Sequence, residues 1–396
     1  IFRLTTYGES HGPGLGGIVE GCPAGLLLSE EDLQNELDLR RPGKGGKGGS
    51  AGTARDEPDR VRLLSGVFEG KTTGTPIAFH VENTDQHSAD YGPLVRVLRP
   101  GHADLGFLAK YGLRDHRGGG RASGRETLSR VAGGAVAQKF LATQGISLSA
   151  FTCELGGLAA PLTDPDGAQS RPFFCPDEAA VSLWEERVTE AKKDGDTLGG
   201  LVRVTATGLP AGLGEPVFDK LDARLAYAFM GLGAVKGVEA GLGFASARLT
   251  GSRNYDPFLP LDPSRPDPNL IPASGALPSG APYGFADNKA GGVLGGVSSG
   301  APLVMTVAVK PISSIAREQR TITLEGQPTA ITVGGRHDIS AIPRIVPVLK
   351  AMAALVIADF VLLQRCARAC YSEFILICPR VVLPPAAKGG RGHRLC

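Results

Sequence analysis

The chain has 396 residues, of which 42% are hydrophobic, so it can bury a sizeable core in one large domain or two. Its formal net charge of only +2 argues against a general nucleic-acid surface, so any arginine cluster is expected to act locally on a small anion. The 56 glycines and 29 prolines exclude a helical bundle and indicate many tight connections in a mixed fold of the α+β class.

Seven cysteines without CxxC pairs predict reduced thiols and a cytoplasmic location. A plastid location is the alternative if a targeting peptide precedes Ile1. The apolar run from Ile345 to Leu363 contains Lys350 and Asp359, which favours a buried helix over a membrane span. No cysteine and histidine spacing indicates a metal site.

The first elements in chain order surround a glycine-rich turn. Alternation predicts a strand from Phe2 to Tyr7 that leads into Gly8-Glu9-Ser10-His11-Gly12. This turn matches the G-x-S-x-G pattern of a serine hydrolase, with Ser10 as nucleophile. The following Pro13-Gly14-Leu15-Gly16-Gly17 is a poor helix start, however, so we consider His11 the chemically interesting residue.

Further elements follow from caps and periodicity. Ser29 opens a capping box for a helix that Arg41-Pro42-Gly43 ends, and a basic loop runs from Lys44 to Arg55. Helices are also predicted at Glu126–Thr143, Asp177–Asp194 and Phe218–Met230, and strands at Ile77–Glu82, Leu201–Thr207 and Leu303–Lys310. The segment 251–287 lacks periodicity and is predicted to be a surface insertion, and the tail 379–396 to be disordered.

The strongest local signal is the stretch from Gly118 to Thr127, which joins a glycine run to Arg121, Ser123 and Arg125 just before a helix. Glycines let backbone N–H groups approach a ligand, a helix N-terminus favours negative charge, and guanidinium groups pair with phosphate or carboxylate. The stretch therefore predicts a site for a phosphorylated ligand.

Two further motifs supply proton carriers, and a third supplies a second anion cluster. Arg99-Pro100-Gly101-His102-Ala103-Asp104 and Gly335-Arg336-His337-Asp338 bring imidazole and carboxyl groups beside arginines. Glycines, lysines and hydroxyls gather at 288–299 and again at 310–314. Acid–base chemistry on a phosphorylated polyanion fits this combination.

In this order, the motifs at 8–12, 99–104, 119–127, 234–239 and 335–338 resemble the signatures of the chorismate synthase family. The resemblance covers residues 1–364 as a single large domain interrupted by 251–287. It implies a β-α-β sandwich and a homotetramer. It also implies a lyase that converts 5-enolpyruvylshikimate 3-phosphate to chorismate by anti 1,4-elimination of phosphate, with reduced FMN and no net redox change. A non-catalytic flavin- or phosphometabolite-binding relative is the alternative.

The resemblance also implies roles for individual residues. The catalytic residues are His11, which protonates the departing phosphate, His102, which stabilises the reduced flavin near its N1, and Asp338, which assists deprotonation through flavin N5. The substrate-binding residues are Ser10, Arg40, Lys47, Arg99, Ser123, Arg125 and Arg336. The flavin-binding residues are His102, Arg121, Ala122, Ser123, Gly233, Ala234, Gly295, Lys310, Pro311, Ile312, Ser313, Ser314, Arg336 and Asp338. Whether NADPH or an external flavin reductase reduces the flavin stays open, and no nucleic acid or membrane partner is expected.

The chain departs from the family pattern at several of these positions. Ala122 and Gly124 stand where Ser and Ala are common, and Gly233 stands where Asn is usual. Ile339-Ser340 replaces a frequent Pro-Cys, and the basic loop carries Lys44 and Lys47 where an arginine is typical. These departures put FMN affinity and substrate closure in question, but none removes a proton carrier.

Overall fold

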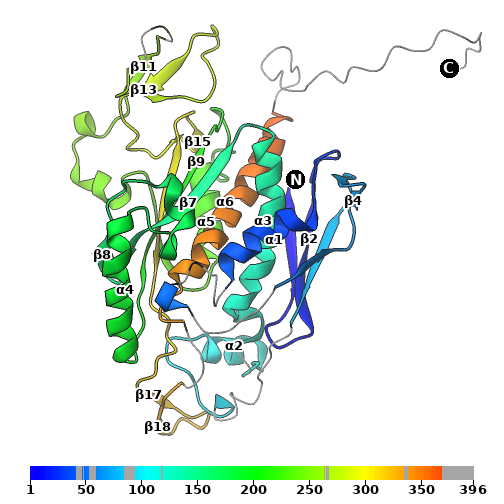
Figure 1. Cartoon of the computed structure of the whole chain (residues 1–396), viewed down its shortest axis with the longest axis vertical. Helices are drawn as coiled ribbons and strands as arrows, with labels where there is room; N and C mark the ends of the chain where they lie inside the picture. The colour runs from blue at the N-terminus through cyan, green and yellow to red at the C-terminus, as the bar shows by residue number, and fades with distance from the viewer. Residues whose placement is uncertain are drawn as a thin grey trace, which may run out of the picture.

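The computed structural model describes residues 1–41, 47, 49–52, 59–83, 94–116, 119–262, 264, 267–333 and 338–367. Within them the chain folds as two antiparallel sheets with helices between, a β-α-β sandwich of the α+β class (Figure 1). The predicted fold class is thereby confirmed. The predicted tail at 379–396 lies outside the described residues.

The first sheet is four-stranded, in the order β1-β2-β6-β3. Its strands are β1 (Arg3–Gly8), β2 (Gly14–Glu20), β6 (Ile77–Glu82) and β3 (Val61–Leu63). Strand β2 is rich in glycine, so its sequence lacks the alternation of apolar and polar residues that predicts a strand. A Cβ on Gly16 would lie only 2.3 Å from the Tyr7 hydroxyl and from the Phe79 carbonyl oxygen. Glycine is needed there because the Tyr7 ring lies across the strand.

The second sheet is five-stranded, in the order β10-β16-β9-β7-β8. Its strands are β10 (Val235–Ala240), β16 (Leu303–Val309), β9 (Gly200–Thr207), β7 (Ser147–Leu155) and β8 (Leu158–Ala159). Residues of β9 and β16 alternate between buried and partly buried positions. This half-buried pattern is the one that predicts strands from sequence.

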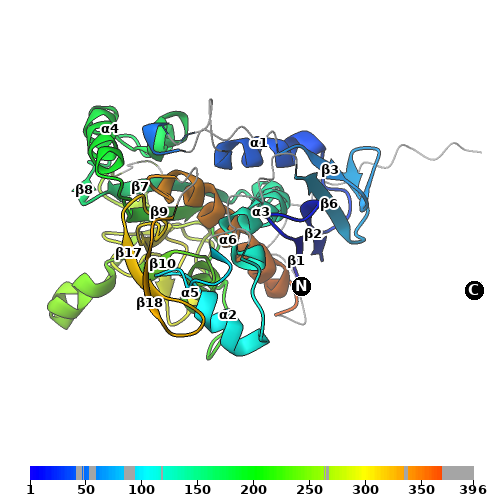
Figure 2. The same ribbon diagram turned by 90° about the horizontal axis from the view of Figure 1, so that it is seen from below.

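Three helices fill the space between the sheets, namely α1 (Glu30–Arg40), α3 (Thr127–Ala142) and α6 (Ile342–Gln364). Figure 2 shows them as the middle layer. Helix α1 begins with the predicted capping box, in which Ser29 and Asp32 exchange hydrogen bonds. Helices α3 and α6 pack so closely that a Cβ on Gly134 would lie 2.3 Å from the Ala351 Cβ.

Helix α6 is the core of the molecule. Among the described residues it is long and apolar enough to span a membrane, yet most of it is buried inside the protein. Its residues Ile342, Leu349 and Ile357 are fully covered. The helix is therefore assigned to the hydrophobic core, as its interruption by Lys350 and Asp359 predicts.

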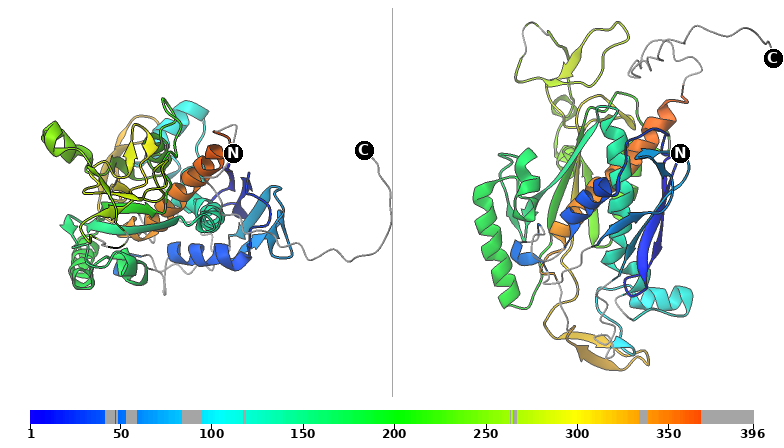
Figure 3. Two further views of the ribbon diagram at one scale, coloured as in Figure 1. Left: turned by 90° about the horizontal axis from the view of Figure 1, so that it is seen from above. Right: turned by 45° about the vertical axis from the view of Figure 1, so that its right-hand side comes forward.

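Smaller elements cap the two ends of the sandwich (Figures 1 and 3). At one end lie α2 (Asp104–Tyr111) and the hairpin of β17 (Gln319–Ile322) and β18 (Pro328–Ile331). At the other end, the segment 251–287 contributes β11 (Phe258–Pro260), β12 (Ile271–Pro272) and β13 (Tyr283–Phe285). Tyr283 and Phe285 form a small separate core with Ala301. This segment thus contains a three-stranded sheet that its aperiodic sequence does not predict.

The remaining elements are α4 (Glu178–Lys193) and α5 (Leu221–Met230), and the short hairpins β4 (Val67–Phe68) with β5 (Lys71–Thr72) and β14 (Val293–Leu294) with β15 (Val297–Ser298). The predicted helices and strands all appear, with ends shifted by a few residues. Strands β2, β7 and β10, helix α2 and the short strands β3, β4, β5, β8, β14, β15, β17 and β18 were not predicted.

Candidate active site

Three loops meet at the end of the molecule that carries α2. They are the turn at 8–12, the segment 99–104 and the glycine–arginine stretch at 119–127. Arg121 donates to the Gly8 carbonyl at 2.6 Å. A Cβ on Gly119 would lie 3.9 Å from Arg99 Nη2, and one on Gly120 would lie 3.6 Å from a Glu9 carboxylate oxygen. Motifs more than 100 residues apart are therefore adjacent in space.

The turn that carries His11 is shaped by Gly8, where β1 ends. Gly8 has φ +85°, and a Cβ there would lie 2.1 Å from the Gly14 carbonyl oxygen, so only glycine fits. The Ser10 hydroxyl lies 3.2 Å from His11 Nδ1. The chain then continues into β2 rather than into a helix, so the strand–turn–helix geometry of a nucleophile elbow is not built around Ser10.

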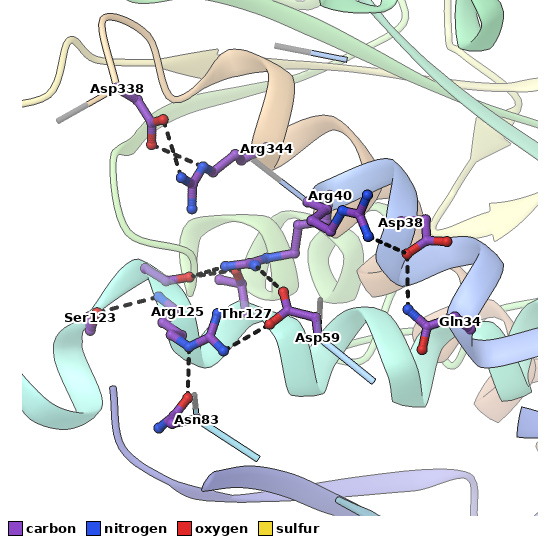
Figure 4. Close-up of polar contacts among 12 residues, drawn as sticks. Gln34, Asp38, Arg40, Asp59, Asn83, Ser123, Arg125, Thr127, Asp338 and Arg344 are labelled. Atoms are coloured by element: carbon purple, nitrogen blue, oxygen red, sulfur yellow. Dashed lines mark hydrogen bonds and ion pairs between the residues drawn. The ribbon is translucent and has the colours of Figure 1, made fainter. Parts of the chain in front are cut away.

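Two of the predicted substrate-binding arginines share one buried carboxylate (Figure 4). Asp59 lies 2.8 Å from Arg125 Nη2 and 4.0 Å from Arg40 Nη1, and the side chains of Asp59 and Arg40 are each only 2% exposed. Arg40 also donates to the Thr127 hydroxyl and to the Gly124 carbonyl. We call Arg40, Asp59 and Arg125 the arginine cluster. Because it is buried and paired, its geometry is fixed before any ligand binds.

The glycine–arginine stretch forms two short 3-10 turns that lead into α3. Arg121 is 41% exposed and reaches back to the Thr6 hydroxyl at 2.6 Å. The Ser123 hydroxyl accepts from the backbone N–H of Arg125 at 3.4 Å and caps the second turn. Ala122 lies exposed between them. The stretch therefore presents a guanidinium group and backbone to an incoming anion.

Arg99 is held by a bidentate ion pair with Asp104. Its Nε and Nη2 lie 3.0 and 2.7 Å from the two carboxylate oxygens, and Arg114 approaches the same carboxylate at 2.9 Å. Burial opposes ionisation of Asp104, but the hydrogen bonds from Arg99 together with both positive charges keep its pKa below the usual value. Asp104 also accepts from the Arg99 backbone at the start of α2.

His102 is held as a neutral imidazole between two partners. Its Nδ1 lies 2.9 Å from the Pro100 carbonyl and must donate to it, which leaves Nε2 as the acceptor for the Ser314 hydroxyl at 3.1 Å. Burial is the main cause that lowers the His102 pKa, and the charges of Arg99 and Lys310 add to it.

The segment 310–314 packs against the 101–102 turn. Lys310 Nζ donates to the Gly101 carbonyl at 3.2 Å and to the Ser313 hydroxyl at 3.1 Å. Ile312 accepts from Thr197, and the Lys310 backbone N–H donates to Ala234, which adopts φ +73°. The predicted flavin-binding residues His102, Ala234, Lys310, Ser313 and Ser314 are thus brought together. We call them the lysine–serine cluster.

Other predicted site residues lie elsewhere or outside the description. Lys47 donates to the Ser170 carbonyl at 2.9 Å. Gly295 lies in the β14–β15 turn beside the start of α5, whereas Gly233 and Ala234 follow the end of that ten-residue helix, about 15 Å away. Arg336 lies outside the described residues.

Asp338 is paired with Arg344 from the first turn of α6, with 2.9 Å between Asp338 Oδ2 and Arg344 Nε. Figure 4 draws this pair in the same view as the arginine cluster. The backbone N–H of the next residue, Ile339, donates to the Ala51 carbonyl, and the Ile339 carbonyl accepts from the Leu198 N–H. Ile339 is therefore held through its backbone, which any residue with a free N–H can do.

Sequence reasoning missed Asp59 and Asn83. Asn83 Nδ2 lies 2.9, 3.3 and 2.8 Å from the carbonyl oxygens of Glu9, Ser10 and Gly12, and its Oδ1 accepts from Arg125 Nε at 2.8 Å. Asn83 immediately follows the predicted strand 77–82. A polar residue at a strand end was the one signal that could have identified it.

Comparison with known proteins bears on this geometry. The family model described as chorismate synthase matches residues 2–362. The chain belongs to the chorismate synthase family. It is 63% identical over 365 residues to the chorismate synthase of Nitratidesulfovibrio vulgaris Hildenborough, covering 92% of this chain and 96% of the relative. It is 52% identical to that of Syntrophobacter fumaroxidans, covering 91% and 95%.

A solved structure titled as the crystal structure of chorismate synthase superposes with a TM-score of 0.69 at 31% identity, covering 92% of each chain. The family resemblance read from the motifs is therefore confirmed. The family is one of lyases, and the chain is an enzyme of that class that acts on a small molecule. A non-catalytic relative is not favoured.

Proposed function

We propose that the enzyme converts 5-enolpyruvylshikimate 3-phosphate to chorismate and phosphate by anti 1,4-elimination, with reduced FMN as cofactor. The C3–O bond to phosphate breaks, the hydrogen at C6 leaves as a proton, and a second double bond forms in the ring, so the overall reaction is redox-neutral. The carrying observation is the neutral His102, held between Pro100 and Ser314 beside Lys310.

The residues present fit a flavin phosphate. The lysine–serine cluster offers an ammonium group, two hydroxyls and an uncharged imidazole, which suits a ligand with an anionic end and a polar ring edge. The turn at Gly101 cannot carry a side chain, because its φ is +70° and a Cβ would lie 2.4 Å from Ser313 Oγ. The backbone at 101 is thereby held close to the segment 310–314.

The residues that would hold reduced FMN are Arg121, Ala122, Ser123, Gly233, Ala234, His102 and Lys310 to Ser314, with Gly295 and Arg336 carried over from the family pattern. When bound, the reduced flavin supplies electron density that assists departure of the phosphate. His102 would stay neutral beside the ring, because burial and the neighbouring cations disfavour its protonation.

The arginine cluster supports recognition of a trianion. Arg40, Arg125 and Arg99 would bind the carboxylates and phosphate of the substrate, and each is held in place by a carboxylate before binding. Ser10 and Ser123 add hydroxyl donors. His11 would then give its proton to the departing phosphate, and Asp338, oriented by Arg344, would assist removal of the C6 proton.

The test is an anaerobic assay with photoreduced FMN and 5-enolpyruvylshikimate 3-phosphate that follows both chorismate absorbance and phosphate release. We expect stoichiometric formation of the two products, and about a 100-fold to 10,000-fold lower kcat for His102→Ala. Ser252→Ala, in the segment 251–287, is the control and should leave kcat unchanged. Absence of product from the wild-type protein at saturating flavin would refute the proposal.

Several finer properties remain part of the same proposal. A homotetramer, a cytoplasmic location, and flavin reduction by NADPH or by a separate reductase are carried over from the family pattern. Molecular mass in solution tests the first of these. Anaerobic NADPH oxidation with added FMN and no other protein tests self-reduction, and lack of oxidation would assign that step to a partner enzyme.

A further inference from the structure

The side chain of Asn83 joins two motifs of the candidate active site that lie more than 100 residues apart in the sequence, the turn at 8–12 and the stretch at 119–127. Its amide nitrogen faces the carbonyl oxygens of Glu9, Ser10 and Gly12 at 2.8 to 3.3 Å. Its amide oxygen accepts from Arg125 Nε at 2.8 Å. These partners also fix the orientation of the amide, because carbonyls need a donor and a guanidinium N–H needs an acceptor.

The backbone strengthens the same attachment. The Asn83 N–H donates to the Pro13 carbonyl at 3.0 Å, immediately after the last pair of the β2–β6 ladder. Asn83 is therefore fixed to the sheet, and from that fixed point its side chain donates to three carbonyls, those of Glu9, Ser10 and Gly12, in the turn that carries His11.

Arg125, the second contact of the Asn83 side chain, is also held on two sides. Arg125 contacts Asn83 through Nε and the 2%-exposed Asp59 through Nη2, so its guanidinium plane is held at both edges. Asn83 contacts both the turn that carries His11 and Arg125. It therefore determines the distance between the His11 imidazole and an anion bound by Arg125. Catalysis by a positioned acid is sensitive to such distances, and a displacement of about 1 Å can cost about 100-fold in rate.

We propose that Asn83 is a positioning residue that sets His11 relative to Arg125, and this inference rests on the proposed function. An aspartate at 83 would keep the acceptor for Arg125 but lose the donor for the three carbonyls. An alanine would lose both. The two variants therefore separate the hold on the His11 turn from the contact with the arginine.

The experiment compares Asn83→Asp and Asn83→Ala with Asn254→Asp, which makes the same chemical change at an exposed position in the segment 251–287. Amide hydrogen exchange of the peptide around residues 8–14 is followed without ligands. Steady-state kinetics then give kcat and KM with reduced FMN. Asn83→Gln, which retains both groups on a longer side chain, serves as the rescue variant and covers the case in which another variant fails to fold.

We expect exchange in the turn to become at least about tenfold faster in Asn83→Asp and Asn83→Ala, as expected when a hydrogen-bond clamp is lost. For Asn83→Asp, kcat should fall about 100-fold while KM changes less than about fivefold. Asn83→Ala should also raise KM, and Asn83→Gln should recover part of kcat. Asn254→Asp should match the wild-type protein in all readouts.

Unchanged exchange in the turn, or a kcat within about threefold of wild type in Asn83→Asp, would overturn the inference. A rise in KM alone would do the same, because it would make Asn83 a binding residue and leave the acid unaffected. If the wild-type protein lacks turnover, the proposed function fails by itself, and the exchange measurement still decides whether Asn83 holds the turn.

Discussion

The arginine cluster and the lysine–serine cluster, two parts of the candidate site, are held by different interactions. In the first, Arg40 and Arg125 share the buried carboxylate of Asp59. In the second, Lys310 donates to a carbonyl and a hydroxyl, and His102 is uncharged. The first cluster therefore depends on charge pairs and the second on backbone conformation, which predicts different responses to substitution.

The largest expected effect comes from removing a carboxylate that two buried arginines share, and Asp104 is such a carboxylate outside the arginine cluster. Asp104→Asn leaves Arg99 and Arg114, which are 9% and 5% exposed, without a counter-charge. Breaking a buried ion pair costs about 3–5 kcal/mol, so the free energy of unfolding in urea should fall by that order. Asp196→Asn removes an exposed pair with Arg317 and should cost under about 1 kcal/mol. Equal losses would contradict the comparison.

The second prediction concerns the backbone beside the lysine–serine cluster. Gly101→Ala places a Cβ 2.4 Å from Ser313 Oγ at φ +70°, whereas Gly112→Ala meets no atom within 4 Å at φ +72°. Both carry the strain of a positive φ, so the difference isolates the contact with Ser313. We expect Gly101→Ala to cost about 1–3 kcal/mol more than its control in thermal unfolding and to weaken FMN binding. Identical melting temperatures would show that the segment 310–314 moves freely.

The third prediction concerns the charge state of His102. Removal of a nearby positive charge favours the protonated imidazole, so Lys310→Gln should raise the His102 pKa, which lies below 6.5 in the wild-type protein. NMR titration of the ring gives both values. Lys192→Gln on the exposed side of α4 is the control and should leave the His102 titration unchanged. A His102 that titrates above 6.5 in wild type would contradict its assignment as neutral.

The fourth prediction concerns Gly233, a predicted flavin-binding position where the family usually has an asparagine. A Cβ on Gly233 would meet no atom within 4 Å, so the backbone there leaves open space at the start of a side chain. An added hydrogen bond is worth about 1 kcal/mol, so Gly233→Asn should tighten FMN binding about fivefold by fluorescence titration. Gly251→Asn, also in open space, is the control and should not change the affinity. An unchanged affinity in Gly233→Asn, as in the control, would place the flavin elsewhere.

The smallest effect is expected from Gly124→Ala at the edge of the arginine cluster. The position has an ordinary backbone conformation and open space around the added Cβ. Lower chain entropy in the unfolded state should then raise the free energy of unfolding by about 0.4–1 kcal/mol. Gly70→Ala, equally open but at φ +73°, should instead lower it.

The fold was predictable wherever local chemistry determined it. The capping box at Ser29, the alternation in β9 and the buried pattern of β16 each specify their elements without distant partners. Strand β2 was not predictable, because its Gly16 is required by close contacts with Tyr7 and Phe79 on the neighbouring strands. The strands of segment 251–287 were missed for a similar reason, since their small core is completed by Ala301.

The residues of the candidate site also differ in how far they could be predicted from the sequence. Residues carried by compact motifs, such as His11, His102 and Arg125, were found because several signals lie within a few positions of one another. Asp59 and Asn83 were not, because each matters only through partners 19 to 74 positions away. Long-range pairing leaves no periodic or compositional trace in a single sequence.

The close approach of Gly134 to Ala351 limits how this enzyme can vary. With no room for even one methyl group between α3 and α6, neither helix can shift to accommodate a new side chain at that crossing. The loops that carry His11, Arg125 and Asp338 adjoin β1, α3 and α6, so the packing of the two helices fixes where these loops begin and end. Differences in substrate or flavin handling among relatives should then arise by loop replacement, with the spacing of the two helices left unaltered.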